Sequence, residues 1–599
     1  MPGKTAHHVP SEARGALRPI EQGARQDGRL AVLELPAAAV GPTAGGARRT
    51  VLMAYALIAV QAALLYVPYV ISGGYIADDW GYLKNAQDFP RYWAQVRHYF
   101  PLMSHRPLVP FVAAAQTLLV GDRPWVYALV NLACWFGFVA IACRALREAF
   151  GHVLAVGVAA LAMVPVLASS VVYWPLAMTG ATLSCLLWAV SFLLVMRGRA
   201  RGRYRLWAYL PLVACMFMYE AVLPLFALTV LLPLLRPPGA GAADSPARRL
   251  VKYALPPVVV AMLPLLSQKL LLPWLLPRLG SPGQLVSRIH LTPDSALQGG
   301  ASWLFALLPG QVLLWSHGLW SALKDWTVAL RLLPAAGAGL AALALAVRAD
   351  RLGPRPACLG RPGAAGAMLL CLAAGSLVCL FSGQLAYFSG GCGNRILFAT
   401  WIGQALVLAW LAADGRARWR RIPVALVLVA STAGMIVQQD NCIRSWRLQQ
   451  QVRASFVAEA ERVDMTPGAT VVADVPRVVG GSYFHAAGFQ TPWDWGSVVA
   501  MPLGARGDQG AVVGLNQPQG LEVTREGGRI TIHDWWRANL DEVWFFRYDP
   551  QSGAVTLRPI DDGDDWDRLI RDVKERNLNP RPDTIEERLA RRFLGGLGM

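Results

Sequence analysis

The chain has 599 residues, of which 55% are hydrophobic and 16% charged, and its formal net charge is +18. Soluble domains usually carry about 25% charged residues, so this composition excludes an ordinary soluble protein and predicts a polytopic membrane protein. The basic residues cluster in short loops between apolar runs, which is typical of the positive-inside rule and not of a phosphate-binding face. We therefore expect membrane lipids, and no nucleic acid, among the partners.

The N-terminal segment 1–48 is rich in Ala, Gly, Arg and Pro and has no periodic apolar face, which predicts a disordered cytoplasmic tail. Residues 49–440 contain about eleven apolar segments that could be spans. The expected spans are 50–71, 124–143, 152–170, 179–197, 206–219, 221–235, 253–276, 328–347, 364–387, 395–412 and 422–438. Two of them, 206–219 and 221–235, are short for a full crossing, so we expect short or tilted helices that meet at Tyr219–Glu220. Segment 301–318 is expected to lie on the membrane surface.

Arginine-rich loops predict the orientation of the chain in the membrane. Arg48 and Arg49 precede the first span, Arg144 and Arg147 follow the second, and four further basic loops alternate in the same way. All of them lie on one side if the N-terminus is cytoplasmic. The outer loop 73–107 and everything after residue 438 then face the periplasm of a bacterial inner membrane.

From about residue 441 the apolar runs end. Strand-like segments are 469–475, 529–532, 542–546 and 555–558, and segment 564–577 has helical spacing. We therefore predict a small periplasmic α/β domain over 441–599. The fold class expected for the whole chain is mostly α, a polytopic membrane helical bundle with this small domain at its end. Cys392 and Cys442 both fall on the outer side, where a disulfide could form.

Two adjacent carboxylates follow the first span. Asp78 and Asp79 come shortly after an apolar run that ends at Ile71. Acids at the mouth of a transmembrane helix are costly, which favours a functional role. Neighbouring residues on a helix point about 100° apart, so at most one carboxylate would face a central pocket. The other could bind a metal, position an acceptor or cap the following helix; capping alone is the alternative to a functional role.

Short motifs around this pair resemble those of GT-C type polytopic glycosyltransferases. The acidic pair is accompanied by Arg106–Pro107 at the start of the next apolar segment, by the outer turn Tyr173–Trp174–Pro175, and by Tyr219–Glu220. The chain looks most similar to the O-antigen glucosyltransferase (GtrII-like) and protein mannosyltransferase-like branches, over roughly residues 50–440. The resemblance implies a GT-C-like domain that moves a sugar from a polyprenyl-phosphate donor to an envelope glycan, lipid or protein acceptor on the periplasmic face, with inversion.

The chemistry of such a transfer assigns expected roles to the residues. Asp78 would be the base that takes the proton of the acceptor hydroxyl, with Asp79 and Glu220 positioning the acceptor. Arg106 and Arg395 would bind the lipid phosphate, because a planar guanidinium can donate two parallel hydrogen bonds to phosphate oxygens. Asp79 and Glu220 could instead hold a divalent cation such as Mg²⁺ or Mn²⁺, and a structural hydrogen bond to a neighbouring helix is the alternative for Glu220.

Four further positions are weighed against structural alternatives. Tyr82, Lys84 and Arg97 lie in the outer loop and are substrate-binding candidates; an aromatic belt with snorkelling cations is the alternative for them. Arg395 ends the Gly-rich segment 389–395, whose backbone N–H groups could approach an anion. A tight turn with a snorkelling arginine is the alternative there.

Two other functions fit a polytopic chain. A transporter or flippase would favour polar residues in several spans and inverted repeats, but few charges beyond Glu220 and Lys269 lie in the apolar segments and no repeat is visible. An O-antigen polymerase or ligase would more often keep its arginines in a large central outer loop, whereas this chain keeps its charges in the first one.

Overall fold

The computed structural model describes residues 42–198, 205–235, 245–275, 277–279, 292–352, 362–382, 392–413, 418–465, 469–476, 478–480, 484–489, 492–503, 510–512, 523–532 and 536–577. Residues 1–41 of the expected tail lie outside the described residues. Positions 42–48 were expected to be disordered as well, but they form the first turns of a helix that begins at Pro42. Eight helices in the described part are long and apolar enough to cross a membrane, or nine if one bent pair is a single span. The chain is a mostly helical, multi-pass membrane protein, as predicted.

Most expected spans are confirmed as helices of sufficient length and apolar character. They are Arg48–Ser72, Pro124–Phe150, Thr179–Arg197, Trp326–Arg351, Gly363–Leu380, Asn394–Ala413 and Arg421–Arg462, with His152–Ala162 and Val166–Tyr173 as a pair bent by 48°. Pro293–Lys324 also passes as a candidate span, although the sequence predicted a surface segment there. Expected spans 206–219, 221–235 and 253–276 are shorter apolar helices instead. Prolines inside these segments, such as Pro211, Pro224 and Pro257, interrupt regular helix hydrogen bonding.

The described residues of the membrane part form twenty-six helical elements. The first half comprises α1 (Pro42–Ser72), α2 (Asp79–Asp88), α3 (Tyr92–Leu102), α4 (Val109–Val120), α5 (Pro124–Phe150), α6 (His152–Ala162), η1 (Val166–Ala168), α7 (Ser169–Tyr173), α8 (Thr179–Gly198), α9 (Arg205–Met216), η3 (Glu220–Leu225) and α10 (Phe226–Leu235). The second half comprises α11 (Pro246–Leu266), η4 (Ser267–Leu271), α12 (Leu272–Leu275), η5 (Pro277–Leu279), α13 (Pro293–Phe305), η6 (Ala306–Gly310), α14 (Gln311–Lys324), α15 (Trp326–Leu352), α16 (Pro362–Ala374), α17 (Ser376–Ser382), η7 (Cys392–Leu397), α18 (Phe398–Ala413), η8 (Arg418–Arg420) and α19 (Arg421–Arg462).

Helix α6 forms the centre of the bundle. All of its residues from Val153 to Ala162 are buried, as expected for a helix that is apolar on every side. α5, α15 and α18 pack around it, while α1 packs mainly on α15 and α5 mainly on α8. The short α9, η3 and α10 meet at Tyr219–Glu220, which confirms the expected pair of short helices.

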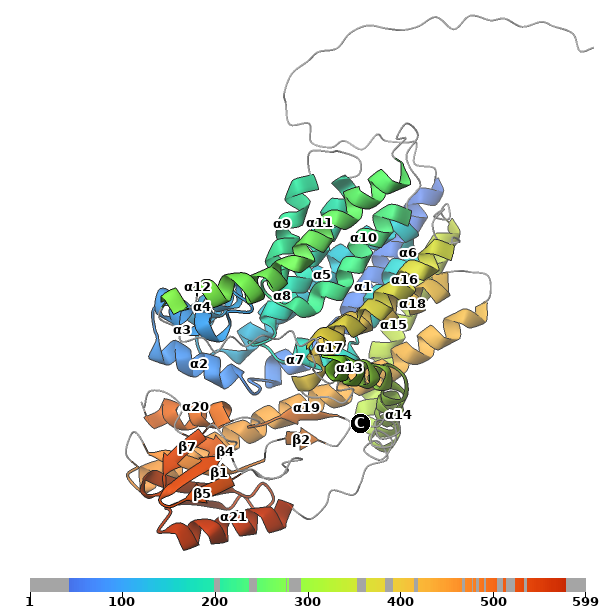
Figure 1. Ribbon diagram of the computed structural model, residues 1–599. Coiled ribbons are helices and arrows are strands. Elements are labelled where there is room, and N and C mark those ends of the chain that lie inside the picture. The colour runs from blue at the N-terminus through green and yellow to red at the C-terminus, as the bar shows by residue number, and fades with distance from the viewer. Residues whose placement is uncertain are drawn as a thin grey trace, which may run out of the picture.

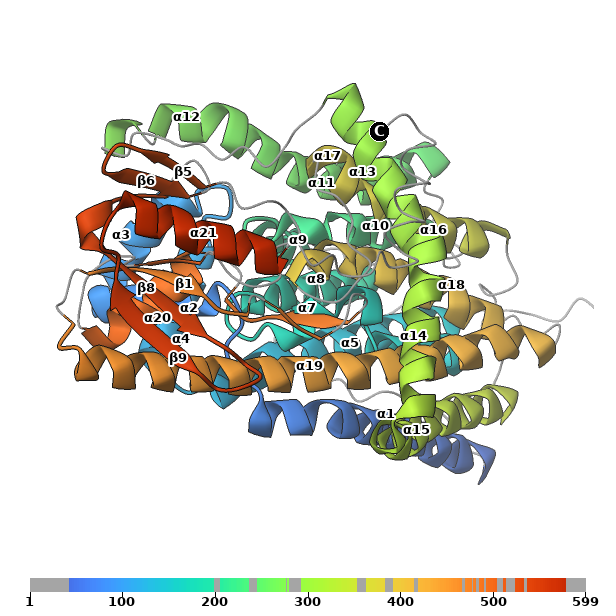
Figure 2. The ribbon, with the colours of Figure 1, turned by 90° about the horizontal axis from the view of Figure 1, so that it is seen from below.

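Helices α13 and α14 take an unexpected course. Together with η6 they form a 32-residue apolar helix over Pro293–Lys324, longer than the surface segment 301–318 predicted from the sequence. α14 is seen nearly end-on in Figure 1 and along its length in Figure 2, so it crosses the direction of the neighbouring spans. Its residue Gly318 fits against the backbone of Gly434 on α19, where a Cβ would come within 2.8 Å. By length and composition this helix could be a span, but α14 runs in a different direction from the neighbouring spans.

Helix α19 continues unbroken through the boundary predicted at residue 440. It has 42 residues, so it is roughly 63 Å long, about twice the thickness of a membrane core of roughly 30 Å. Its first half packs in the bundle and its second half carries the C-terminal domain, on the opposite end of the bundle from the start of α1 (Figure 1). Cys442 on this helix is a buried free thiol, so the disulfide considered with Cys392 is not formed.

The C-terminal domain confirms every strand and the helix expected from the sequence. Its main sheet has the order β4-β1-β8-β9, in which β1 pairs in parallel with β4 and β8, and β8 pairs antiparallel with β9. The elements are β1 (Thr470–Asp474), β2 (Val478–Gly480), β3 (His485–Ala487), α20 (Pro492–Leu503), β4 (Gly510–Val512), β5 (Val523–Glu526), β6 (Arg529–Ile532), β7 (Trp536–Asn539), η9 (Leu540–Glu542), β8 (Val543–Tyr548), β9 (Val555–Pro559) and α21 (Gly563–Asn577). Side chains alternate across β1, so Val471 joins the core beside α19 and Val472 joins the core beneath α21.

One hydrophobic core joins this domain to the outer loop. It contains Tyr75 and Trp80 of the loop, Phe456 of α19, and Trp495 and Phe546 of the domain. Trp80 stacks on Trp446 of α19, with ring centroids 5.9 Å apart. The segment with the acidic pair is therefore held between the end of the bundle and the C-terminal domain.

This junction predicts a strong effect of adding one methyl group at Gly74. A Cβ there would lie 2.0 Å from the Trp446 ring, and overpacking of this kind costs about 1–3 kcal/mol. We expect Gly74→Ala to lower the melting temperature of the detergent-solubilised protein and to speed protease cleavage between the bundle and the C-terminal domain. Gly337→Ala is the control, because a Cβ at that helical position meets nothing within 4 Å. Equal stability of the two variants would contradict the close packing described here.

Candidate active site at the outer end of the bundle

The acidic pair begins helix α2 after a strained turn. Ala77 has a φ of 47°, a left-handed conformation that costs a residue with a side chain about 1–3 kcal/mol. Asp78 follows as the N-cap residue of α2, yet its side chain makes no capping hydrogen bond. Asp78 is half-buried and Asp79 fully buried. The two carboxylates therefore occupy different environments, as the helical spacing predicted.

Asp79 is held by backbone groups of two segments. Its Oδ2 accepts a hydrogen bond from the N–H of Ile76 at 3.1 Å, and its Oδ1 accepts one from the N–H of Ala177 at 2.8 Å. Ala177 follows the outer turn Tyr173–Pro175, so this carboxyl fastens the first outer loop to the second. Burial raises the pKa of the Asp79 carboxyl to about 8, although the two N–H groups act in the opposite direction. Asp79 thus positions the loop, whereas Asp78 is the half-buried member of the pair.

Arg106 and Glu220 form a bidentate ion pair. Nε and Nη2 of Arg106 donate to the two carboxylate oxygens of Glu220 at 2.7 and 2.6 Å. The guanidinium also lies over the ring of Tyr219, 4.2 Å from its centroid. Because a guanidinium has five N–H groups, the pair leaves donors of Arg106 available while fixing their direction. Glu220 therefore orients Arg106, which corresponds to the structural alternative considered for this acid.

Arg395 is positioned by its neighbour in the chain. The buried Asn394 accepts hydrogen bonds from the N–H and Oγ of Ser170 at 3.2 and 2.6 Å, and donates to Ser169 at 3.1 Å. This anchors η7 to α7 and puts the Arg395 guanidinium over the ring of Trp174, 5.3 Å from its centroid. Positions 389–391 of the Gly-rich segment lie outside the described residues.

Trp174 is a residue whose role the sequence did not predict. Its side chain is buried, and its indole N–H has no hydrogen-bond partner among the described residues. A buried indole N–H usually finds an acceptor, so this donor beside Arg395 is suited to an oxygen atom of a ligand. The only sequence signal was the position of Trp174 in the outer turn.

Tyr82 is the residue at which the predicted site converges. Burial raises the pKa of its phenol; the charges of Asp78 and Asp79 raise it further, and those of Arg106 and Arg395 lower it. All four charged groups are therefore close enough to act on one hydroxyl, although they come from α2, the α3–α4 turn and η7. The structure thus brings together five of the eight predicted site residues, with Glu220 attached through Arg106.

Lys84 and Arg97 have other surroundings. Lys84 is buried and forms an ion pair with Asp88 on the same helix. Arg97 is exposed on α3. Their predicted contact with substrate stays a prediction.

The described residues do not favour a metal centre. Within them, no group of three or more His, Cys, Asp or Glu side chains could hold a metal ion. Asp79 accepts backbone hydrogen bonds and Glu220 binds Arg106, so the two acids expected to hold Mg²⁺ or Mn²⁺ are both engaged elsewhere. We derive no chemical step through a metal.

An apolar pocket of about 820 Å³ lies next to Arg106. Pro107 and Leu108, which directly follow the arginine, form one wall, and residues of α11, η4 and α12, such as Leu266 and Trp274, form another. The Leu108 N–H donates to the carbonyl of Phe217 at 3.2 Å, which keeps this wall beside the Tyr219–Glu220 turn. The charged cluster therefore borders a hollow that is lined almost wholly by hydrocarbon.

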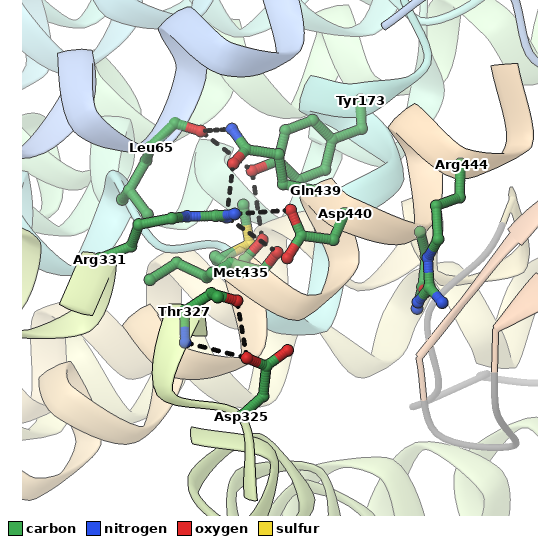
Figure 3. Close-up of polar contacts among 11 residues, drawn as sticks. Leu65, Tyr173, Asp325, Thr327, Arg331, Met435, Gln439, Asp440 and Arg444 are labelled. Atoms are coloured by element: carbon green, nitrogen blue, oxygen red, sulfur yellow. Dashed lines mark hydrogen bonds and ion pairs between the residues drawn. The ribbon is translucent and has the colours of Figure 1, made fainter. Parts of the chain in front are cut away.

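A second polar cluster, which the sequence did not predict, connects α19 to the bundle. Nη1 of Arg331 on α15 binds Oδ1 of Asp440 at 2.7 Å, and its Nη2 donates to Oε1 of Gln439 at 2.9 Å (Figure 3). Gln439 in turn donates to the carbonyl of Leu65 on α1. The hydroxyl of Tyr173 donates to the carbonyl of Met435 at 3.4 Å. These bonds connect α1, α7, α15 and α19 just before α19 leaves the bundle.

Comparisons with known proteins add little to this geometry. No family model matches the chain, and no curated protein matches it. The chain is similar to the crystal structure of ArnT from Cupriavidus metallidurans bound to undecaprenyl phosphate, with 15% identity, coverage of 78% of this chain and 86% of that chain, and a TM-score of 0.34. A likeness at that score carries no argument about the function of this chain.

The buried carboxyl of Asp79 predicts a pH-dependent contribution to stability. Its pKa of about 8 in the folded protein lies above the ordinary value of 3.8, so the folded protein holds this proton more tightly than the unfolded chain does. The contribution is fully present below about pH 4 and is lost as the pH rises through about 8. We expect the melting temperature of the wild type, relative to that of Asp79→Asn, to fall between about pH 5 and pH 9.

The control for this experiment is Asp78→Asn, which changes the half-buried neighbour and should keep most of the pH dependence. If the difference in melting temperature between wild type and Asp79→Asn stays constant over this range, Asp79 is ionised throughout and its burial does not dominate its pKa.

Proposed function

We propose that the protein is a GT-C type glycosyltransferase that moves a sugar from polyprenyl phosphate to an acceptor hydroxyl of the cell envelope. The observation that carries the proposal is an acidic pair placed beside two arginines at the border of an apolar pocket. Asp79, next to Asp78, binds the segment that follows Trp174, Arg395 lies over Trp174, and Arg106 directly precedes two residues of the pocket wall. A lipid-linked donor requires this combination: a base for the acceptor, cations for the phosphate and an apolar surface for the chain. The acceptor can be a glycan, a lipid or a protein.

The proposed reaction is a single displacement. Asp78 takes the proton of the acceptor hydroxyl while its oxygen forms a bond to the anomeric carbon. The bond between that carbon and the phosphate oxygen breaks, and the electron pair leaves with the polyprenyl phosphate. Attack from the face opposite to the leaving group inverts the anomeric configuration.

The arginines have complementary roles in this proposal. Arg106, oriented by Glu220 and Tyr219, and Arg395, placed by Asn394, stabilise the negative charge that develops on the phosphate. The indole N–H of Trp174 donates to an oxygen of the same group or of the sugar. The chain of the lipid lies in the pocket beside Pro107 and Leu108. The site faces the periplasm if the basic loops are cytoplasmic.

The different environments of the two aspartates predict different mutant phenotypes. In a deletion strain complemented with Asp78→Asn, we expect loss of a sugar from the envelope glycan with normal amounts of folded protein, because a general base contributes about 10²–10⁴-fold to the rate. Asp79→Asn should instead lower the amount and melting temperature of the protein. Mass spectrometry of the glycan and quantitative blots measure both effects.

If Asp78→Asn restores the complete glycan, Asp78 is not the base and the proposed transfer loses its main support. If deletion removes no sugar but stops export of a complete lipid-linked glycan, the transporter or flippase alternative is correct. If glycan chain length changes without loss of a sugar type, the polymerase or ligase alternative is correct.

The orientation of Arg106 predicts a further test that needs no sugar. Arg106→Lys removes the planar fork, so binding of undecaprenyl phosphate to the purified protein should weaken about tenfold. Arg123→Lys is the matched control, because Arg123 is exposed at the start of α5, outside the candidate site, and the change should leave affinity unchanged. Equal affinities of the two variants would place the phosphate elsewhere.

A further inference from the structure

A second apolar hollow lies at the side of the bundle, between α1 and α5. Its volume is about 910 Å³, and Ala159 of α6 and Met163 just after this helix form its floor. The hollow exists because α1 packs mainly on α15 and α5 mainly on α8, so that the two helices lean on α6 without closing on each other. Small residues on both walls, including Ala63 and Ala133, keep it open.

The groove has the length and lining of a lipid-chain site. Along α1 it extends from Tyr55 to Val70, about 22 Å, and along α5 from Leu129 to Arg147, about 27 Å. One leaflet of a bilayer core is roughly 15 Å thick, so a chain that enters at one end stays within the groove. Nearly all of the lining side chains are apolar.

The charged residues of the groove gather at one end. Arg144 and Arg147 lie three positions apart on α5, hence on one face, and both line the groove. Arg144 is 57% exposed and lies 3.7 Å from Glu148. Arg147 is exposed and forms no ion pair among the described residues, and Tyr55 of α1 lines the groove with it. This end therefore offers a cation at the headgroup level, where anionic lipids are attracted by about 1 kcal/mol per basic residue.

We propose that this groove binds an anionic phospholipid, with one acyl chain along α1 and α5 and the phosphate on Arg144 and Arg147. The site is separate from the charged cluster around Tyr82, because it opens at the end of α5 that carries the basic loop. The inference does not depend on the proposed sugar transfer.

Native mass spectrometry of the delipidated full-length protein tests this site. The probes are dioleoyl phosphatidylglycerol and its zwitterionic counterpart dioleoyl phosphatidylcholine. We expect one phosphatidylglycerol to bind at least about fivefold more tightly than phosphatidylcholine. The preference should disappear in the double variant Arg144→Gln, Arg147→Gln and persist in Arg348→Gln, which removes an exposed arginine of α15 that does not line the groove.

Filling the groove separates chain binding from charge. Ala133→Phe should abolish tight binding of phosphatidylglycerol while both arginines remain, and Ala63→Phe on the facing helix serves if Ala133→Phe does not fold. Three results would overturn the proposal: equal binding of the two lipids, equal loss in Arg348→Gln and the double variant, or unchanged binding when a folded protein has a filled groove.

Discussion

The outer half of this protein depends on the buried amide of Gln449. Its Oε1 accepts from the indole of Trp80 at 2.6 Å, and its Nε2 donates to the carbonyl of Tyr75 and to Ser445 Oγ, each at 3.1 Å. Ser445 in turn donates to the carbonyl of Ala487 in the C-terminal domain. Because an unpaired buried amide costs about 1–3 kcal/mol per lost partner, these bonds fix the loop, α19 and the domain in one arrangement. The position of the acidic pair follows from that arrangement.

The charged groups of the site are arranged so that a carboxylate that can accept a proton and guanidinium groups that can bind phosphate lie close together. Glu220 neutralises and orients Arg106, and backbone N–H groups hold Asp79. Asp78 and Arg395 contribute groups of opposite sign whose charges both act on Tyr82. A carboxylate that accepts a proton and a guanidinium that stabilises a leaving phosphate suit the two ends of a glycosyl transfer. The surrounding apolar residues strengthen both effects, since they keep the local dielectric constant low.

The pocket beside Arg106 and the groove between α1 and α5 have similar linings, although they border arginines at different ends of the bundle. Each is lined by hydrocarbon and bordered by arginine: Arg106 beside the pocket of about 820 Å³, and Arg144 with Arg147 at the groove of about 910 Å³. Both form where short or diverging helices fail to pack directly on one another. Lipid binding at both ends would stabilise a bundle whose helices α9, η3 and α10 are too short to cross a membrane by themselves.

Much of the fold could be predicted from local sequence. Apolar runs located the long spans, and alternation located β1, β6, β8 and β9, because hydrophobic periodicity acts within one element. Strands β2, β3, β5 and β7 were missed, since they are short and are stabilised by pairing with a neighbouring strand. β2 pairs with β3, and β5 and β7 both pair with β6. The count of spans was too high where prolines shorten the helices, and the boundary at residue 440 was placed where hydropathy falls although the backbone of α19 continues.

For the site, the sequence by itself determined which residue types are present: an acidic pair after the first span and arginines before later ones. Tertiary structure decided their roles. Asp79 became a positioning group because Ala177, far along the chain, donates to it; Glu220 became the partner of Arg106 because the α9–η3 turn packs against the α3–α4 turn. Lys84 forms an ion pair with Asp88. The guanidinium of Arg395 lies over the ring of Trp174 because Asn394 anchors the segment that carries Arg395. The local sequence determines which chemical groups are present. Their burial and their hydrogen-bond partners depend on distant segments that only the folded chain brings together.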